Sequence, residues 1–250
     1  MSTERRNLHI FHDPPCDGST NMARDEYLLY SEQYRPAAIR IYGWTPPTIS
    51  LGCFQRFEQI SELSDETRKL AVVRRPTGGG AILHDREITY CLVVDDSLPI
   101  ARKSPTDLYL LVHSIWRDAL ESTGLRSELA PEHLPFPSPR SGPFFCFQKP
   151  GRTDLIIGAD KLLGSAQRRI PGRVMQHGSL ILGRRFSDHP GADIGGPPAE
   201  LTERWIELFL ERLAGELDLE RCPATWTAGQ NEDVAQRRVR FASDEWTRRR

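Results

Sequence analysis

The sequence has no long apolar run and no excess of charge of one sign. No segment approaches the ~20 consecutive apolar residues that a membrane span needs, and residues 1–8 lack the apolar core of a secretory signal. The 33 basic and 34 acidic residues leave a formal net charge of −1. There is therefore no overall field to attract nucleic acid or an anionic membrane. We expect a cytoplasmic protein without nucleic-acid or membrane partners.

Cysteines are few, and their spacing argues against two common kinds of site. They are odd in number, and none forms a Cys-x-x-Cys pair, so neither a structural zinc nor a redox motif is predicted. No clustered histidine, aspartate or glutamate spacing indicates a metal site either. In a reducing compartment all five are expected to be free thiols, of which one can be a nucleophile. They are Cys16, Cys53, Cys91, Cys146 and Cys222.

Hydrophobic residues make up 38% of the 250 positions, enough for a substantial core. Caps and apolar spacing predict helices over about 19–30, 104–124 and 199–216. Alternating or apolar segments predict strands over 38–42, 48–51, 70–73, 88–94, 154–157, 161–166, 167–170 and 173–182. Because the strands fall in hairpins and the helices in separate blocks, an α+β fold is favoured over β-α-β alternation. The arginine-rich tail, 236–250, is expected to be frayed.

A glycine-rich segment, Thr77-Gly-Gly-Gly80, lies between two of the predicted strands. Three glycines let the backbone approach a ligand closely and present N–H groups to it. A flexible connection between strands is an equally good interpretation. The segment is neither a Walker loop nor a dinucleotide-binding fingerprint.

Two further residues have the chemistry of a reactive site. Lys161 begins an otherwise apolar, small-residue strand, where an ammonium group can hold a carbonyl oxygen or favour the thiolate of a neighbouring cysteine. The ordinary alternative is a solvated surface lysine. Cys146, within Phe144–Phe147, follows the proline-rich loop 131–143, a position where catalytic groups are often placed. The ordinary alternative there is a buried core cysteine.

Five motifs, in order, resemble those of the lipoate–protein ligase and octanoyltransferase family. They lie at 21–29, 40–55, 74–85, 161–168 and 176–182. The resemblance implies an α+β fold similar to the catalytic domain of biotin and lipoyl protein ligases, with a mixed β-sheet, a smaller second sheet and flanking helices. It also implies a single acyltransferase domain over 1–250, with the family-like core at about 19–218.

The position of the cysteine points to one class within this family. Cys146-Phe147, upstream of Lys161, resembles the ligase-like octanoyltransferases, whereas Met175-Gln176 occupy the place where another class carries its cysteine. The segment 149–154, Lys-Pro-Gly-Arg-Thr-Asp, departs from the usual Pro-Ser-x-Tyr-Asp/Glu. This class transfers an octanoyl group from octanoyl-acyl carrier protein, through a cysteine thioester, to a lysine of a lipoyl-carrying protein. Acceptors of this kind are the glycine cleavage H protein and dehydrogenase E2 lipoyl domains, and no cofactor is implied.

The resemblance also implies site residues. Cys146 is the expected nucleophile, and Lys161 is expected to stabilise its thiolate. The glycine segment and Arg75 are expected to shape an acyl tunnel and the carbonyl site. The full set of expected substrate-binding residues is Arg75, Thr77, Gly78, Gly79, Gly80, Ala81, His84, Gly164, Ser165, Ala166, His177 and Gly178.

Two other functions remain open at this point. In an ATP-dependent lipoate ligase with its accessory domain on a separate chain, the glycine segment and Lys161 would hold an acyl-adenylate, with magnesium, and Cys146 would be a bystander. A non-catalytic lipoyl- or biotin-binding protein would need no nucleophile.

A docking surface for acidic partner proteins is expected to be local, because the chain is nearly neutral overall. Arg168, Arg169 and Arg173 surround the Pro171-Gly172 turn and form the predicted patch. A solvated hairpin tip is the alternative interpretation.

Overall fold

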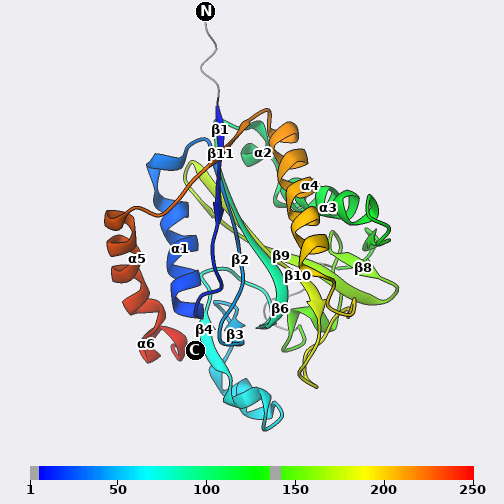
Figure 1. Ribbon diagram of the computed structural model, residues 1–250. Helices are drawn as coiled ribbons and strands as arrows, with labels where there is room; N and C mark the ends of the chain where they lie inside the picture. Colours follow the sequence, from blue (N-terminus) through cyan, green and yellow to red (C-terminus); the bar gives the residue numbers. More distant parts are fainter. Residues whose placement is uncertain (1–5, 136–141) are drawn as a thin grey trace, which may run out of the picture.

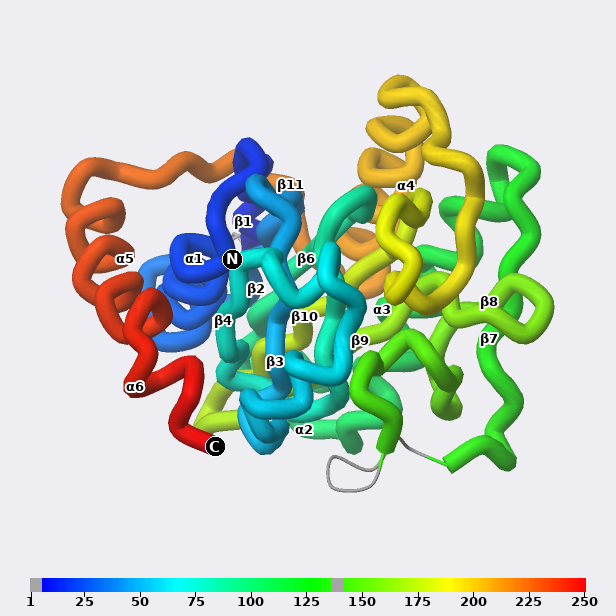
Figure 2. The backbone as a smooth tube through the Cα atoms, turned by 90° about the horizontal axis from the view of Figure 1, so that it is seen from below, coloured from blue at the N-terminus to red at the C-terminus, as the bar shows by residue number. Residues whose placement is uncertain are grey.

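The computed structural model describes residues 6–135 and 142–250. A mixed eight-stranded sheet lies at its centre, in the order β11 (Glu220–Pro223), β1 (Asn7–His12), β2 (Ala37–Tyr42), β6 (Arg86–Asp95), β10 (Arg173–Gly183), β9 (Asp160–Ile170), β8 (Leu155–Ile157), β7 (Glu128–Leu129). The pairs from β11 to β2 are parallel, and those from β2 to β7 are antiparallel. A small sheet has the order β4 (Ala71–Arg74), β3 (Thr48–Leu51), β5 (Ile82–His84). Figure 2 shows this small sheet in front of the lower end of the large one.

Helices cover both faces of the large sheet, which gives three layers (Figure 1). One face carries α1 (Gly18–Tyr30) and α5 (Ala228–Phe241), with α6 (Asp244–Thr247) beside β4. The other face carries α3 (Pro105–Glu121) and α4 (Ala199–Leu217), preceded by the short α2 (Pro99–Arg102). Short 3₁₀ helices are η1 (Glu32–Tyr34), η2 (Phe57–Glu62), η3 (Thr67–Lys69) and η4 (Cys146–Gln148).

Each face of the large sheet has its own apolar core, because side chains along a strand point alternately to the two sides. On the α3–α4 side, the Trp116 ring stacks on Phe209 with the ring centroids 4.1 Å apart. On the α1 side, Met22 and Phe11 belong to the core that the first and last helices cover. The central strands β6, β10 and β9 are thus covered on both faces, and β9 and β10 carry part of the site.

The predicted fold class, a mixed sheet with a smaller second sheet and flanking helices, is confirmed. The three predicted helices correspond to α1, α3 and α4. Segments 161–166 and 167–170 form one continuous strand, β9, rather than two. The edge pair β1 and β11 was not predicted. Of the proline-rich loop 131–143, residues 136–141 lie outside the described residues.

The prediction of a frayed tail over 236–250 is wrong. Helix α5 begins at a capping box between Thr227 and Gln230, and it buries Val234 and Phe241 beside α1. The many arginines occupy the other faces of this helix, so the charged composition concealed an amphipathic pattern.

Within 6–135 and 142–250, no helix has both the length and the apolar character required to cross a membrane.

Candidate active site

A buried lysine connects the predicted nucleophile to a carboxylate. The Lys161 ammonium lies 3.3 Å from the Cys146 sulfur and 2.8 Å from Asp154 Oδ2. Burial lowers the pKa of Lys161, but the negative charges of Asp154 and Cys146 outweigh this effect and raise that pKa above its usual value. Lys161 is therefore a cation that lies in contact with the Cys146 sulfur.

The lysine can reach this position because the strand that carries it has no side chain at Gly164. A Cβ atom there would lie 2.1 Å from Lys161 Cε and 2.4 Å from Nζ. On its other side the ammonium lies 4.9 Å from the centre of the Phe147 ring. Lys161 is only 2% exposed, so the alternative of a solvated surface lysine is wrong.

The cysteine segment is fastened to the glycine-rich loop by backbone hydrogen bonds. Cys146 N–H donates to the carbonyl of Ala81 over 2.8 Å, and Ala81 N–H donates to the carbonyl of Phe144 over 2.7 Å. A Cβ atom at Gly80 would lie 2.9 Å from the Cys146 nitrogen, so only glycine permits this close approach. The loop and the nucleophile consequently hold one another in place.

Cys146 and Lys161 both line an open cleft. It brings together six of the predicted site residues, the other four being Gly78, Gly79, Ser165 and Ala166. Its remaining lining residues are Tyr109, Arg152, Thr153, Asp154 and Gln167. The wall of the cleft therefore contains the Cys146 thiol, the cations of Lys161 and Arg152, and the glycine backbone.

A second, more enclosed cavity, hereafter the inner cavity, adjoins the cleft at Ala166, which lines both. The predicted residues Arg75, His84, His177 and Gly178 also line it. Its remaining walls are Met22, Tyr42, Trp44, Ser50, Ile82, Thr89 and Ser179. The inner cavity thus lies between the two sheets, next to the cleft that holds Cys146.

Arg75 braces the glycine loop from the inner cavity. Its buried guanidinium donates to the carbonyls of Gly78 over 2.7 Å, Gly80 over 2.6 Å and Ser50 over 2.9 Å. Burial lowers the pKa of Arg75, and the nearby Cys146 thiol partly counteracts this. The side chain orients the loop, since two of these hydrogen bonds go to loop carbonyls and the third ties it to β3.

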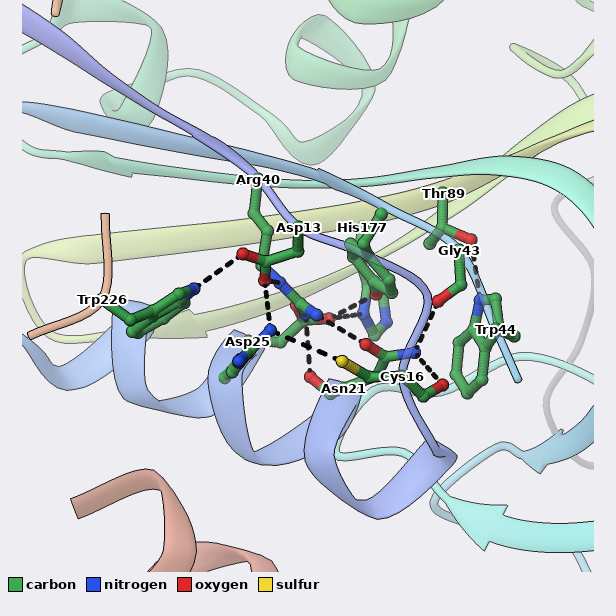
Figure 3. A network of polar contacts seen from close by, with 12 residues as sticks. Asp13, Cys16, Asn21, Asp25, Arg40, Gly43, Trp44, Thr89, His177 and Trp226 are labelled. Carbon is green, nitrogen blue, oxygen red and sulfur yellow. Dashed lines mark hydrogen bonds and ion pairs between the residues drawn. The ribbon is translucent and has the colours of Figure 1, made fainter. Parts of the chain in front are cut away.

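A network of buried charges positions His177 (Figure 3). Asp25 Oδ2 lies 3.1 Å from His177 Nδ1, and Thr77 Oγ1 lies 2.6 Å from Nε2. The fully buried Arg40 donates to Asp25 over 2.8 Å and also pairs with Asp13. Burial alone would raise the pKa of Asp25, but the His177 hydrogen bond and the Arg40 charge hold that pKa below its usual value. A charged Asp25 fixes the imidazole, which in turn fixes Thr77 in the glycine loop.

His84 lies in the wall of the inner cavity, where its ring stacks on Trp44 with the centroids 3.7 Å apart. Its Nδ1 lies 2.7 Å from Glu87 Oε1, and its Nε2 lies 2.7 Å from Ser50 Oγ. Burial lowers the pKa of His84, and the Glu87 carboxylate opposes that effect. Both ring nitrogens are thus occupied by protein groups.

Thr77, Gly80, Ala81 and Gly164 line neither the cleft nor the inner cavity, and they support residues that do. Asp154 was not predicted as a site residue. The sequence contained a signal for it, because Asp154 ends the segment 149–154 with the acidic residue that the family pattern has there. In the described part of the chain, no three histidine, cysteine, aspartate or glutamate side chains are grouped so as to hold a metal ion.

The predicted basic patch at the Pro171-Gly172 turn is wrong. Arg173 is buried and donates to backbone carbonyls at the end of α1, including that of Leu29. Arg169 donates to the carbonyls of Ala101 and Lys103, whereas Arg168 points toward the glycine loop and donates to Pro76 over 3.1 Å. The side chains diverge because neighbouring residues of a strand face opposite sides.

A buried histidine behind the cleft makes the stability of the fold sensitive to acid. His113 Nε2 lies 2.7 Å from Ser165 Oγ, and its Nδ1 contacts the carbonyl of Thr153, the residue before Asp154. Burial lowers the pKa of His113 from 6.5 to about 4. As the pH falls below 6.5, His113 becomes protonated in the unfolded chain but stays neutral in the folded protein until the pH approaches 4. The stabilisation is therefore complete above pH 6.5 and is lost between pH 6.5 and pH 4.

We expect the free energy of unfolding of the unmodified protein to fall by about 3 kcal/mol more than that of His113→Gln across this range, at about 1.4 kcal/mol per pKa unit. Urea denaturation at pH 7.5, 5.5 and 4.5 measures both proteins. Parallel losses in the two would contradict the assignment.

The sequence and the fold were compared with those of known proteins. Residues 17–190 match the family model of the lipoyl protein ligase A/B catalytic domain. The octanoyltransferase LipM of Geobacillus kaustophilus is 33% identical over 94% of this chain and 95% of its own length. That of Kyrpidia tusciae is 32% identical over 96% and 98%.

Solved structures share the fold at low sequence identity. Lipoate-protein ligase A bound with ATP superimposes with a TM-score of 0.77 at 16% identity, covering 97% of this chain and 98% of that one. A bi-partite lipoate protein ligase from Thermoplasma acidophilum gives 0.72 at 16% identity, with 98% and 97% covered.

Proposed function

Because the chain belongs to the family of the lipoyl protein ligase A/B catalytic domain, we propose that it is an octanoyltransferase that acts through Cys146. The octanoyl group passes from octanoyl-acyl carrier protein to Cys146 and then to a lysine of a lipoyl-carrying protein. The observation that carries this proposal is the 3.3 Å contact between the Lys161 ammonium and the Cys146 sulfur inside the cleft. The relatives named octanoyltransferase, which align over nearly the whole chain, support it.

In the first half-reaction, the Cys146 thiolate attacks the carbonyl carbon of the donor thioester. A bond forms between that carbon and Cys146 Sγ, the bond to the carrier's sulfur breaks, and the departing thiolate takes a proton from solvent. Negative charge develops on the carbonyl oxygen in between. Lys161 and the glycine backbone at Gly78 and Gly79 lie in the same cleft and can stabilise this oxygen.

The alkyl chain of the bound octanoyl group would occupy the inner cavity. The cavity and the cleft share Ala166 in their linings, which places the cavity next to the cleft that holds Cys146. Apolar side chains such as Met22, Trp44 and Ile82 line the cavity and would contact the methylene groups.

In the second half-reaction, the acceptor's lysine must first lose a proton to become a neutral amine. The amine nitrogen then attacks the thioester carbon, its second proton leaves, and Cys146 Sγ departs as a thiolate. Lys161 again stabilises the sulfur, because Asp154 keeps it charged throughout. Both reactions exchange an already activated acyl group, so no nucleotide is needed.

The test is the intact mass of the protein after mixing with octanoyl-acyl carrier protein in the absence of ATP. We expect one octanoyl adduct, removable by hydroxylamine, which disappears when a lipoyl-domain acceptor is added. An adduct or a transfer that requires ATP and magnesium would show a lipoate ligase instead. Absence of transfer under both conditions would indicate a binding protein.

A further inference from the structure

The C-terminal tail reaches the rim of the glycine loop and is anchored there. The buried Arg74 guanidinium donates to the carbonyl of Thr247 over 3.0 and 2.7 Å, and the Trp246 indole N–H donates to the carbonyl of Arg74 over 2.8 Å. Phe57 N–H donates to the carbonyl of Arg250 over 2.8 Å. Arg74 lies three residues before Thr77, the first residue of the glycine segment. The same residue therefore holds the C-terminal tail and the start of the loop.

The last two arginines lie beside an exposed aromatic ring at this rim. Phe54 is 53% exposed, and its ring is 3.8 Å from the position that a Cβ atom on Gly78 would take. The Arg250 guanidinium lies 5.5 Å from the centre of the Phe54 ring. Arg249 stacks 3.7 Å from the centre of the Trp246 ring. We call Phe54, Arg168, Arg249 and Arg250 the basic rim.

The arginines of the basic rim differ from the other arginines of the tail in their ion pairs. Arg237 and Arg240 pair with Glu26, Arg238 pairs with Asp17, and Arg248 pairs with Asp244. Among the described residues, no carboxylate side chain forms an ion pair with the three rim arginines. Burial lowers the pKa of Arg249. The Cys53 thiol opposes this effect, and repulsion by Arg250, Arg240 and Arg168 adds to it. A cluster of like charges destabilises the isolated chain and is relieved when an acidic partner binds.

The rim adjoins the cleft, since Gly78 lies next to the Phe54 ring and also lines the cleft with Cys146. A donor protein must deliver its thioester to Cys146 on a flexible arm, while its own surface stays outside. An acidic surface bound at the rim would place the start of that arm at the mouth of the cleft. The exposed Phe54 gives such an interface an apolar centre with charges around it.

We propose that the basic rim is the docking surface for the acidic carrier protein that delivers the acyl thioester. This inference rests on the proposed function, because it assigns the surface to the first half-reaction. It replaces the patch expected at the Pro171-Gly172 turn and keeps only Arg168 from it.

The test reverses two rim charges in the variant Arg249→Glu/Arg250→Glu. We expect acylation of Cys146 by octanoyl-acyl carrier protein at low salt to slow by about tenfold or more, with a flatter dependence on salt. Acylation by a small neutral thioester, octanoyl-N-acetylcysteamine, should keep its rate. The matched control Arg126→Glu/Arg204→Glu changes the net charge equally at exposed positions between α3 and β7 and on α4, and should keep both rates.

Three results would overturn the docking role. Equal losses with both donors would mean that the tail supports the active site. A normal acylation rate with slow transfer from the acyl-enzyme to the acceptor would assign the rim to the acceptor protein. An unchanged rate with every substrate would leave the rim without a partner. By contrast, an unmodified protein that accepts octanoyl from neither donor refutes the proposed function itself.

Discussion

Cys146→Ser is expected to reduce octanoyl transfer by at least roughly 10³-fold, as is usual when a covalent nucleophile is removed. A serine hydroxyl does not ionise near neutral pH, so the 3.3 Å contact with Lys161 would no longer produce a nucleophile. Hydroxylamine-labile acylation should also disappear from the intact-mass spectrum.

Cys222→Ser is the matched control, because Cys222 lies in the edge strand β11, away from the cleft, and should retain full activity. Cys91 is a poorer control, since a hydroxyl in its fully buried position would be costly. Transfer by Cys146→Ser at the normal rate would disprove the nucleophile assignment.

Lys161→Met should slow acylation by roughly 10²-fold, because the cation that stabilises the thiolate and the developing oxyanion is lost. Alkylation of Cys146 by iodoacetamide at pH 7 should slow as well. The substitution also leaves the Asp154 carboxylate buried without its counter-ion, a loss that typically costs about 3–5 kcal/mol of stability.

The double variant Lys161→Met/Asp154→Asn separates the two effects. The neutral amide can still accept the hydrogen bond that Gly151 N–H now donates to Asp154, so stability should largely return while transfer stays slow. Recovery of transfer together with stability would mean that Lys161 serves only to neutralise Asp154. Unchanged alkylation in Lys161→Met would contradict its effect on the thiol.

The parts of the fold that sequence reasoning predicted are those with a local signal. Examples are the capping box at Ser104 and the apolar face of α3, because both are formed by residues that are close together in the sequence. The pairing of β1 with β11 joins opposite ends of the chain, and no local pattern indicates it. The same holds for α5, because its apolar face is buried only by packing against α1, which lies far away in the sequence.

The site shows the same division. The motifs identified Cys146 and Lys161, which the structure brings into contact. They could not reveal that Lys161 is buried, because a hydropathy scale treats lysine as an isolated charged side chain and takes no account of its counter-ion. Asp154 and the space above Gly164 make that burial possible, and both depend on how β8 pairs with β9.

The ion pair between Lys161 and Asp154 has a consequence for timing. In the proposed cycle, forming the thioester removes one negative charge from the group of Cys146, Lys161 and Asp154, and releasing it restores that charge. A lysine neutralised by the thiolate alone would become an unpaired buried cation in the acyl-enzyme. Asp154 remains beside it in both states, 2.8 Å away. The acyl-enzyme is therefore not destabilised by an unpaired buried cation in the interval between the departure of the carrier protein and the binding of the acceptor.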